Sequence, residues 1–257
     1  MRNVFIYILI ILNCQLGANP KVSIITSVYN GDLFIEGFMA NIVNQSIFTD
    51  CELIMINANS PGNEEVVIKK YMQKYRNIRY LRLDKDPGVY AVWNLAIRIS
   101  NAEYITNANL DDRFKDDCYE KHAKALEAHS HIDLVYSNFY VTQTPNGVFG
   151  NAKNCIAREI AEFSKRAMQQ PLPNNHPMWR KSMHVKYGFF NENFKHAGDF
   201  EMWLRAVKEG AQFLKIPGFY SLYYYNPDGL STNIKKNQAI RLEEYEIYNA
   251  YKDVFNA

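Results

Sequence analysis

Two adjacent carboxylates, Asp111 and Asp112, follow a short segment that ends at Asn107. Carboxylate oxygens are hard ligands, so such a pair at the end of a strand can hold a divalent cation, which in turn can bridge phosphate groups. An Asp-Asp pair before a helix is also typical of helix capping. The pair by itself is therefore compatible with a metal site and with a helix cap, and the sequences of the neighbouring loops are needed to distinguish the two.

Three further side chains could take part in chemistry in the second half of the chain. Asp199 opens the segment GDFEMWLR, which has helical spacing, so its carboxylate either caps a helix or acts as a general base. His176, in Asn-His-Pro, either lines a substrate site or is a surface histidine. Trp203 either stacks on the face of a sugar ring or packs in the core.

The elements that must position these residues alternate between strands and helices. Apolar runs predict strands at 21–28, 52–56, 78–83, 104–107 and 132–136, and helical spacing predicts helices at 33–45, 63–75, 89–100 and 116–129. This order is typical of an α/β fold with a mostly parallel sheet and helices on both faces. Ligands of such sheets bind at the carboxyl ends of the strands.

Polar loops follow four of the predicted strands and begin at Ser27, Asn57, Asp84 and Asn107. None of them contains GxGxxG or a Walker motif, which argues against a dinucleotide-dependent oxidoreductase and a P-loop phosphotransferase. Because the carboxyl ends of parallel strands share one edge, the four loops are expected to converge there. That convergence favours a ligand site over a simple helix cap at Asp111.

The regular alternation ends after Val141. The pattern there predicts a helix at 157–168, a second helix at 199–209 and two short strands within 212–225. A long amphipathic helix is predicted in the last segment, 236–257. Its apolar stripe packs on the domain or, alternatively, lies against a membrane or a partner.

The composition is that of a globular protein. The chain has 257 residues, of which 47% are hydrophobic and 22% charged, with a net charge of +2. These values exclude a mostly disordered chain and give no strong field for binding nucleic acid. Four cysteines without a CxxC spacing argue against a zinc ribbon or a redox motif. The length suits one α/β domain with short appendages.

The first 18 residues form a separate segment. One Arg precedes an apolar run, which is followed by Leu-Gly-Ala. This pattern predicts a secretory signal peptide or a short membrane anchor at 1–18. The protein is then expected in the secretory pathway or at a membrane, and otherwise in the cytoplasm.

Five segments taken together resemble the glycosyltransferases of family 2, which have the GT-A fold. In chain order they are VSIITSVYN, INANS, DPGVYAVWNLAI, NANLDD and GDFEMWLR, and they cover about residues 21–210. The resemblance is to the branch with a GxYxxxN loop and an NxDD metal motif. It implies one transferase domain at 19–235, with a nucleotide-sugar half at 19–115 and an acceptor half at 116–235.

The resemblance also implies roles for individual residues. Asp199 takes the place of the general base, and Asp111, with Asp112 beside it, takes the place of the ligands of a divalent cation, Mn²⁺ or Mg²⁺. The implied substrate-binding residues are Ser27, Tyr29, Asn57, Gly88, Tyr90, Asn94, Asn109, His176 and Trp203. The implied reaction moves a sugar from a nucleotide sugar, a UDP-sugar above all, to a hydroxyl of a glycan, lipid or protein acceptor with inversion.

Besides Ser27, which stands where the family has Pro, three positions depart from its pattern. Asn57 and Asn109 stand where the family has carboxylates, and Gly198 stands where it has Glu. The departures leave open an alternative, a non-catalytic nucleotide-sugar-binding or carbohydrate-binding protein on the same fold. A nucleotidyltransferase would need a Gly-rich, basic loop after the first strand, and SVYNGD is neither.

Overall fold

The computed structural model describes residues 19–233, 235 and 237–255. The predicted signal peptide or anchor at 1–18 lies outside these residues. Within the described ranges, no helix combines the length and the apolar character needed to cross a membrane.

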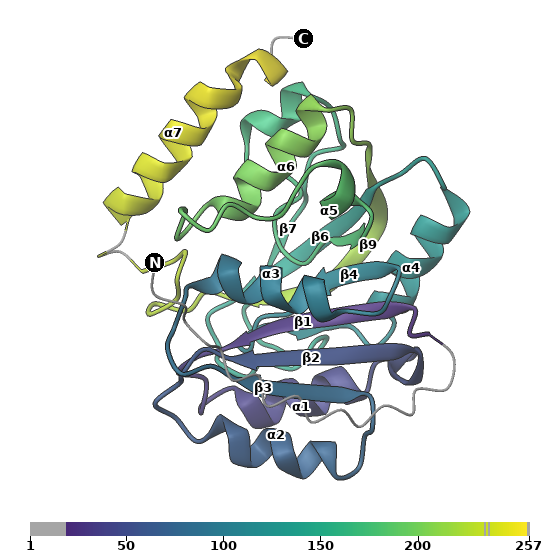
Figure 1. Ribbon diagram of the computed structural model, residues 1–257, viewed down its shortest axis with the longest axis vertical. Coiled ribbons are helices and arrows are strands. Elements are labelled where there is room, and N and C mark those ends of the chain that lie inside the picture. The colour runs from purple at the N-terminus through teal and green to yellow at the C-terminus, as the bar shows by residue number, and fades with distance from the viewer. Residues whose placement is uncertain (1–18, 234, 236, 256–257) are drawn as a thin grey trace, which may run out of the picture.

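The described chain forms one large sheet with flanking helices (Figure 1). The strands are β1 (Val22–Val28), β2 (Cys51–Asn57), β3 (Ile78–Arg82), β4 (Tyr104–Asn107), β5 (Arg113–Phe114), β6 (Leu134–Thr142), β7 (Ile156–Arg158), β8 (Met178–Arg180) and β9 (Phe213–Tyr224). The helices are α1 (Ile35–Val43), α2 (Glu64–Met72), α3 (Val89–Ile99), α4 (Cys118–Ala128), α5 (Met183–Lys186), α6 (Gly198–Lys208) and α7 (Asn237–Phe255). Short 3₁₀ turns occur at Phe48–Asp50 and Arg166–Gln169.

The order of the strands brings several strand ends to one edge. The sheet runs β3-β2-β1-β4-β8-β6-β9-β5, with β7 added on β6. Strands β1 to β4 are mutually parallel, and Val28 at the end of β1 lies beside Asn57 at the end of β2. Strand β8 is antiparallel to both β4 and β6, and β6 is parallel to β9. Strands β1, β2, β4, β6 and β9 therefore all end at the same edge, as the α/β prediction requires.

Two cores cover the two faces of the sheet. Every residue of β2 is buried, because alternate side chains point to opposite cores. Leu53 packs into the core that contains α1, α2 and α4, whereas Ile54 packs into the core that contains α3 and α6. Figure 1 shows α3 and the pair α1 and α2 on opposite faces of the sheet. The β-branched apolar runs of the sequence are thus explained by burial on both faces.

The predictions for the second half were partly wrong. The segment predicted as a helix at 157–168 contains strand β7, which pairs with β6, and only a short 3₁₀ turn. Pairing with the edge of β6 overrides the helical spacing of the apolar residues. The two short strands predicted within 212–225 are one strand, β9, whose register with β6 shifts at Pro217-Gly218. Gly218 has a φ of 110°, which accounts for the break in the pattern.

The long helix predicted near the C-terminus is α7. Ile247, Val254 and Phe255 are buried on its inner side. The Tyr251 hydroxyl donates to Glu201 of α6 over 2.7 Å, and Lys208 of α6 forms an ion pair with Asp253. Helix α7 therefore packs along α6, beside which it lies in Figure 1.

Candidate active site

The loops after β1 and β2 are fastened to each other by a buried carboxylate. Glu64, in the first turn of α2, accepts hydrogen bonds from the Gly31 amide at 2.5 Å and from the Ser60 hydroxyl at 2.7 Å. The Ser60 hydroxyl in turn accepts the amide of Asn30 at 2.9 Å. The side chain of Glu64 is fully buried, so these bonds form in a setting of low dielectric, where they are strong. They make the two loops one rigid rim at the edge of the sheet.

Three predicted donor-binding residues lie on this rim. Ser27 is half-buried near the end of β1, and the ring of Tyr29 is 53% exposed just beyond it. Asn57 ends β2, and its amide oxygen accepts the Ser60 amide at 2.7 Å. The buried amide nitrogen of Asn57 has no hydrogen-bond partner within the described part of the chain. An exposed aromatic ring beside a buried polar end is suited to a flat ligand with polar edges.

Asp112 holds together the loop that follows β4. One of its oxygens accepts His176 Nε2 at 2.8 Å and Asn109 Nδ2 at 3.0 Å. The other accepts the amide of Tyr224, at the end of β9, at 3.0 Å. Asp112 is fully buried, and both of its oxygens already have donors from the protein. The structure thus places Asp112 as a link between three chain segments.

His176 belongs to this buried link. Its side chain is buried, and its ring meets that of Phe114 edge-on with centroids 4.8 Å apart. The carboxylate at Nε2 favours the tautomer that carries its proton there. His176 has a φ of 56°, so its backbone lies in the left-handed region, which the contacts with Asp112 and Phe114 hold in place.

Asp111 has a different hydrogen-bond partner from Asp112. It is half-buried, and one of its oxygens accepts Asn226 Nδ2 at 3.0 Å. Burial, together with the nearby carboxylate of Asp112, raises the pKa of Asp111 to about 6, while the bond from Asn226 opposes the rise. A group of three or more His, Cys, Asp or Glu side chains arranged for a metal ion does not occur among the described residues. The oxygen donors at this point are the Asp111 carboxylate and the amide of Asn109.

Asp199 lies in the first turn of α6, where Tyr90 from the first turn of α3 meets it. The Tyr90 hydroxyl donates to Asp199 Oδ1 over 3.1 Å. Burial raises the pKa of Asp199, whereas the bonds from the Phe200 amide and the Tyr90 hydroxyl oppose the rise. Helix α6 leads into the start of β9, so its first turn lies toward the edge where β9 and β4 end. Topology therefore places Asp199 and Asp111 at one edge of the sheet.

The absence of a side chain at position 198 has a direct structural reason. A Cβ there would lie 2.8 Å from an atom of the Tyr90 ring, closer than van der Waals contact allows. The ring of Tyr90 stacks on that of Phe190, with centroids 5.9 Å apart. The departure at Gly198 therefore makes room for the residue that binds Asp199.

Of the remaining predicted residues, only Gly88 is exposed. Gly88, with a φ of 93°, precedes the first residue of α3 and is exposed. Asn94 is buried and exchanges two hydrogen bonds with the backbone of Phe190, at 2.9 and 3.0 Å. Trp203 is 3% exposed and packs edge-on against Trp179, which favours packing in the core over stacking on a sugar ring.

Some residues of the site were missed by the sequence reasoning. Asn226 binds Asp111, and Tyr224 binds Asp112 through its backbone. Both lie at the carboxyl end of β9, so the strand-end rule could have found them had the strand been predicted whole. Glu64 was not among the predicted site residues, although its side chain joins two loops.

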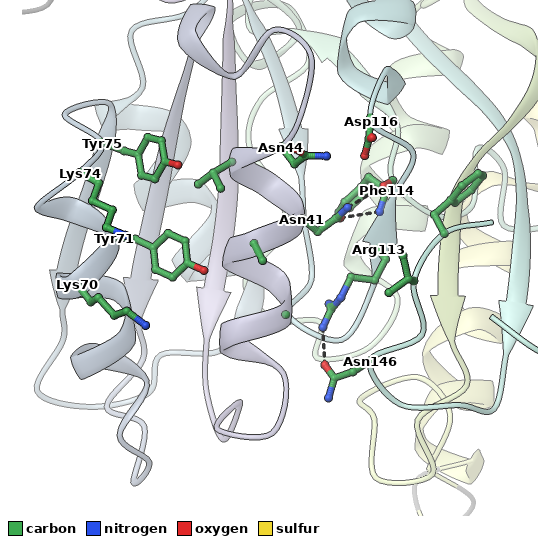
Figure 2. A pocket seen from close by; sticks show the side chains of 15 residues that line it. Asn41, Asn44, Lys70, Tyr71, Lys74, Tyr75, Arg113, Phe114, Asp116 and Asn146 are labelled. Carbon is green, nitrogen blue, oxygen red and sulfur yellow. Dashed lines mark hydrogen bonds between the residues drawn. The ribbon is translucent and has the colours of Figure 1, made fainter. Parts of the chain in front are cut away.

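A pocket of about 680 Å³ lies elsewhere, over the outer side of α1. Figure 2 shows residues from α2 and the turn after it on one side, and residues near β5 on the other; those labelled include Lys70, Tyr71, Lys74, Tyr75, Arg113 and Asn146. The rings of Tyr71 and Tyr75 stack with centroids 6.3 Å apart. None of the predicted site residues lines this pocket.

Comparisons with known proteins bear on the family and the fold. The chain is 25% identical over 221 residues to an uncharacterised glycosyltransferase of Methanocaldococcus jannaschii, an alignment that covers 85% of this chain and 76% of the relative. The structure resembles S. aureus TarS in complex with UDP-GlcNAc, with a TM-score of 0.72 and 17% identity over 91% of this chain and 70% of that one. Another TarS structure is covered over 61% of its length.

A further similar structure is the mannosyltransferase PcManGT of Pyrobaculum calidifontis in complex with GDP-Man and Mn²⁺, with a TM-score of 0.63 and 14% identity. The alignment covers 93% of this chain and 73% of that one. At such identities the likeness shows the fold, which is GT-A. The model of the family described as Glycosyl transferase family 2 matches residues 23–191, more than half of the chain. The chain therefore belongs to glycosyl transferase family 2.

Proposed function

We propose that this protein transfers a sugar from a nucleoside diphosphate sugar to an acceptor hydroxyl, with inversion at the anomeric carbon. The observation that carries the proposal is the placement of Asp199. Its Oδ1 atom accepts a hydrogen bond from the Tyr90 hydroxyl at 3.1 Å. It lies toward the same edge of the sheet as the loop after β4 that carries Asp111. In a family 2 fold, a half-buried carboxylate at this edge would supply the base beside the donor side.

The donor is proposed to lie across the loops after β1 and β2. The exposed ring of Tyr29 offers a stacking surface for a nucleobase, and Asn57 offers a polar end. Gly88 precedes α3, whose second residue is Tyr90, and we propose that its loop also contacts the donor. TarS in the similar structure binds UDP-GlcNAc, and we take a UDP-sugar as the first donor to test.

A divalent cation, Mn²⁺ or Mg²⁺, fits the chemistry of the donor atoms at the end of β4. Asp111 would hold it through its carboxylate, and Asn109 leaves its amide oxygen for it, because its nitrogen is already bonded to Asp112. One or two such protein ligands together with substrate phosphates are a common arrangement for Mg²⁺. When bound, the cation would neutralise charge on the diphosphate. The mannosyltransferase in the similar structure binds Mn²⁺.

Asp199 is proposed to act as the general base. As the acceptor oxygen forms a bond to the anomeric carbon, its proton passes to the carboxylate, and the bond from that carbon to the diphosphate oxygen breaks with its electron pair. Attack from the face opposite to the leaving group inverts the carbon. The Tyr90 hydroxyl holds Asp199 Oδ1, which orients the carboxylate toward the acceptor before it arrives.

The test is Asp199→Asn, which keeps the size of the side chain and its ability to cap α6. Transfer from UDP-sugars should fall at least about a hundredfold, because general-base catalysis contributes about 10²–10⁴-fold. Binding of UDP with Mn²⁺, measured by calorimetry, should stay within about twofold of the parent, because the proposed donor site lies on other loops.

A matched control is Glu209→Gln, which removes an exposed carboxylate just after the same helix. It should transfer sugar like the parent. Transfer within a few-fold of the parent in Asp199→Asn would show that Asp199 is only a cap. A parent that binds UDP-sugars but transfers to no acceptor would favour the binding-protein alternative.

A further inference from the structure

The carboxylate of Glu243, on α7, binds three consecutive backbone amides of another segment. Glu243 Oε1 accepts the amide of Lys195 at 2.9 Å, and Oε2 accepts the amides of His196 at 2.8 Å and Ala197 at 3.0 Å. Bonds from N–H groups to an ionised carboxylate are stronger than those between neutral groups. Successive amides that converge on one anion also fix the conformation of the backbone that carries them.

The segment that Glu243 holds leads directly into the proposed base. Ala197 is the N-cap residue of α6, and its methyl side chain cannot cap the helix. Gly198 and Asp199 follow as the first two residues of the helix. The first amides of a helix lack partners inside it, and the amide of Ala197, at the N-cap of α6, has its partner in Glu243. In this protein, a carboxylate of α7 supplies that contact.

Helix α7 is well placed to act as a fixed support. Its buried side chains and the contacts of Tyr251 and Asp253 with α6 attach it to the domain. It also passes near the base, since the charge of Asp199 adds to the effect of burial in raising the pKa of Glu244. The family model ends at residue 191, so this support lies outside the part of the chain that it matches.

We propose that Glu243 is a positioning residue for Asp199: it fixes residues 195–197 and thereby the direction of the base. The inference rests on the proposed function. It differs from a merely stabilising role, because its effect falls on the proton-transfer step and not on binding of the donor. It also gives α7 a part in the reaction.

The experiment compares Glu243→Ala and Glu243→Gln with the parent in the full chain. In Glu243→Ala, kcat should fall about tenfold to a hundredfold, because a displacement of about 1 Å can lower a rate by that much. The KM for the UDP-sugar should stay within about twofold. Glu243→Gln keeps one acceptor oxygen, so its kcat should lie between those of the parent and Glu243→Ala.

The control is Glu246→Ala, which removes an exposed carboxylate from the same helix. Its kcat should equal that of the parent. Hydrogen exchange gives a readout that does not depend on activity: the amides of residues 195–197 should exchange at least about tenfold faster in Glu243→Ala and at the parental rate in Glu246→Ala. Glu243→Gln keeps the comparison available if the alanine variant does not fold.

The outcomes separate this inference from the proposed function. A transferring parent with kcat within twofold in both Glu243 variants would overturn the positioning role alone, as would a loss confined to the KM for the donor. An equal loss of kcat in Glu246→Ala would overturn it too. A parent that transfers no sugar would refute the proposed function and, with it, the role of Asp199 as a base to be positioned.

Discussion

Replacement of Gly198 by alanine should destabilise the protein, although alanine normally favours helices. A Cβ at this position would lie 2.8, 2.9 and 3.0 Å from three atoms of the Tyr90 ring. The ring cannot easily move away, because Tyr90 is 3% exposed, stacks on Phe190 and meets Trp93 edge-on at 5.6 Å. Either the ring or the start of α6 must shift.

Two opposing effects set the size of the change. Gly198 does not have a positive φ, so alanine fits its backbone, and the change from glycine in a helix would by itself stabilise the fold by roughly 0.5–1 kcal/mol. Overpacking of a filled core costs about 1–3 kcal/mol. The second effect is the larger, and we expect a net loss of about 1–2 kcal/mol. For a chain of this size, that lowers Tm by roughly 2–8 °C.

The measurement is thermal unfolding of Gly198→Ala in the parent and in a Tyr90→Ala background. Removal of the ring removes all three close atoms, so in that background the same substitution should raise Tm or leave it unchanged. Transfer by Gly198→Ala should also fall at least about tenfold, because a shift at this contact moves Asp199. A Gly198→Ala protein that is more stable than the parent would refute the reasoning.

Three further predictions concern the carboxylates. Asp111→Asn should lose the Mn²⁺-dependent part of UDP binding in calorimetry yet unfold at the parental temperature, because burial already disfavours the charge of Asp111; unchanged affinity would contradict its role as a ligand. Asn109→Asp should lower the free energy of unfolding, measured in urea, by about 1–3 kcal/mol, because it replaces the hydrogen-bond donor to Asp112 by a second carboxylate. The double variant Asn109→Asp with Asp112→Asn should recover part of this loss. The transfer rate should fall with decreasing pH as Asp199 is protonated, with a midpoint above the usual pKa of 3.8. The substitution Tyr90→Phe should move that midpoint to higher pH, because the Tyr90 hydroxyl stabilises the charged form of Asp199. An unmoved midpoint would argue against this hydrogen bond.

The first half of the fold was predictable because burial imposes a simple pattern on it. Strands that are buried on both faces must be continuously apolar, and the predicted strand at 104–107 has the observed bounds, while the one at 52–56 lies within Cys51–Asn57. The second half was less predictable, because short strands such as β8 have only three residues. Their pairing is decided by distant segments and not by their own pattern.

The location of the candidate site could be predicted from the sequence, but the different contacts of its individual residues could not. The strand-end rule led to Asp111 and Asp112 together, because the sequence gives no direction for either side chain. In the structure, the first is half-buried and meets Asn226, whereas the second is fully buried and meets His176. Only the fold brings β9 and the loop of His176 to these carboxylates.

The departures from the family pattern bear on whether this chain is an enzyme. Loss of function would leave replaced residues without matching partners, but two of the three departures are matched. Asn109 donates to Asp112 at 3.0 Å, which a carboxylate at 109 could not do. Gly198 leaves the space that the ring of Tyr90 fills, and the hydroxyl of that ring holds Asp199. Each of these substitutions therefore comes with a contact that orders a carboxylate at the edge of the sheet, which is what the proposed function requires.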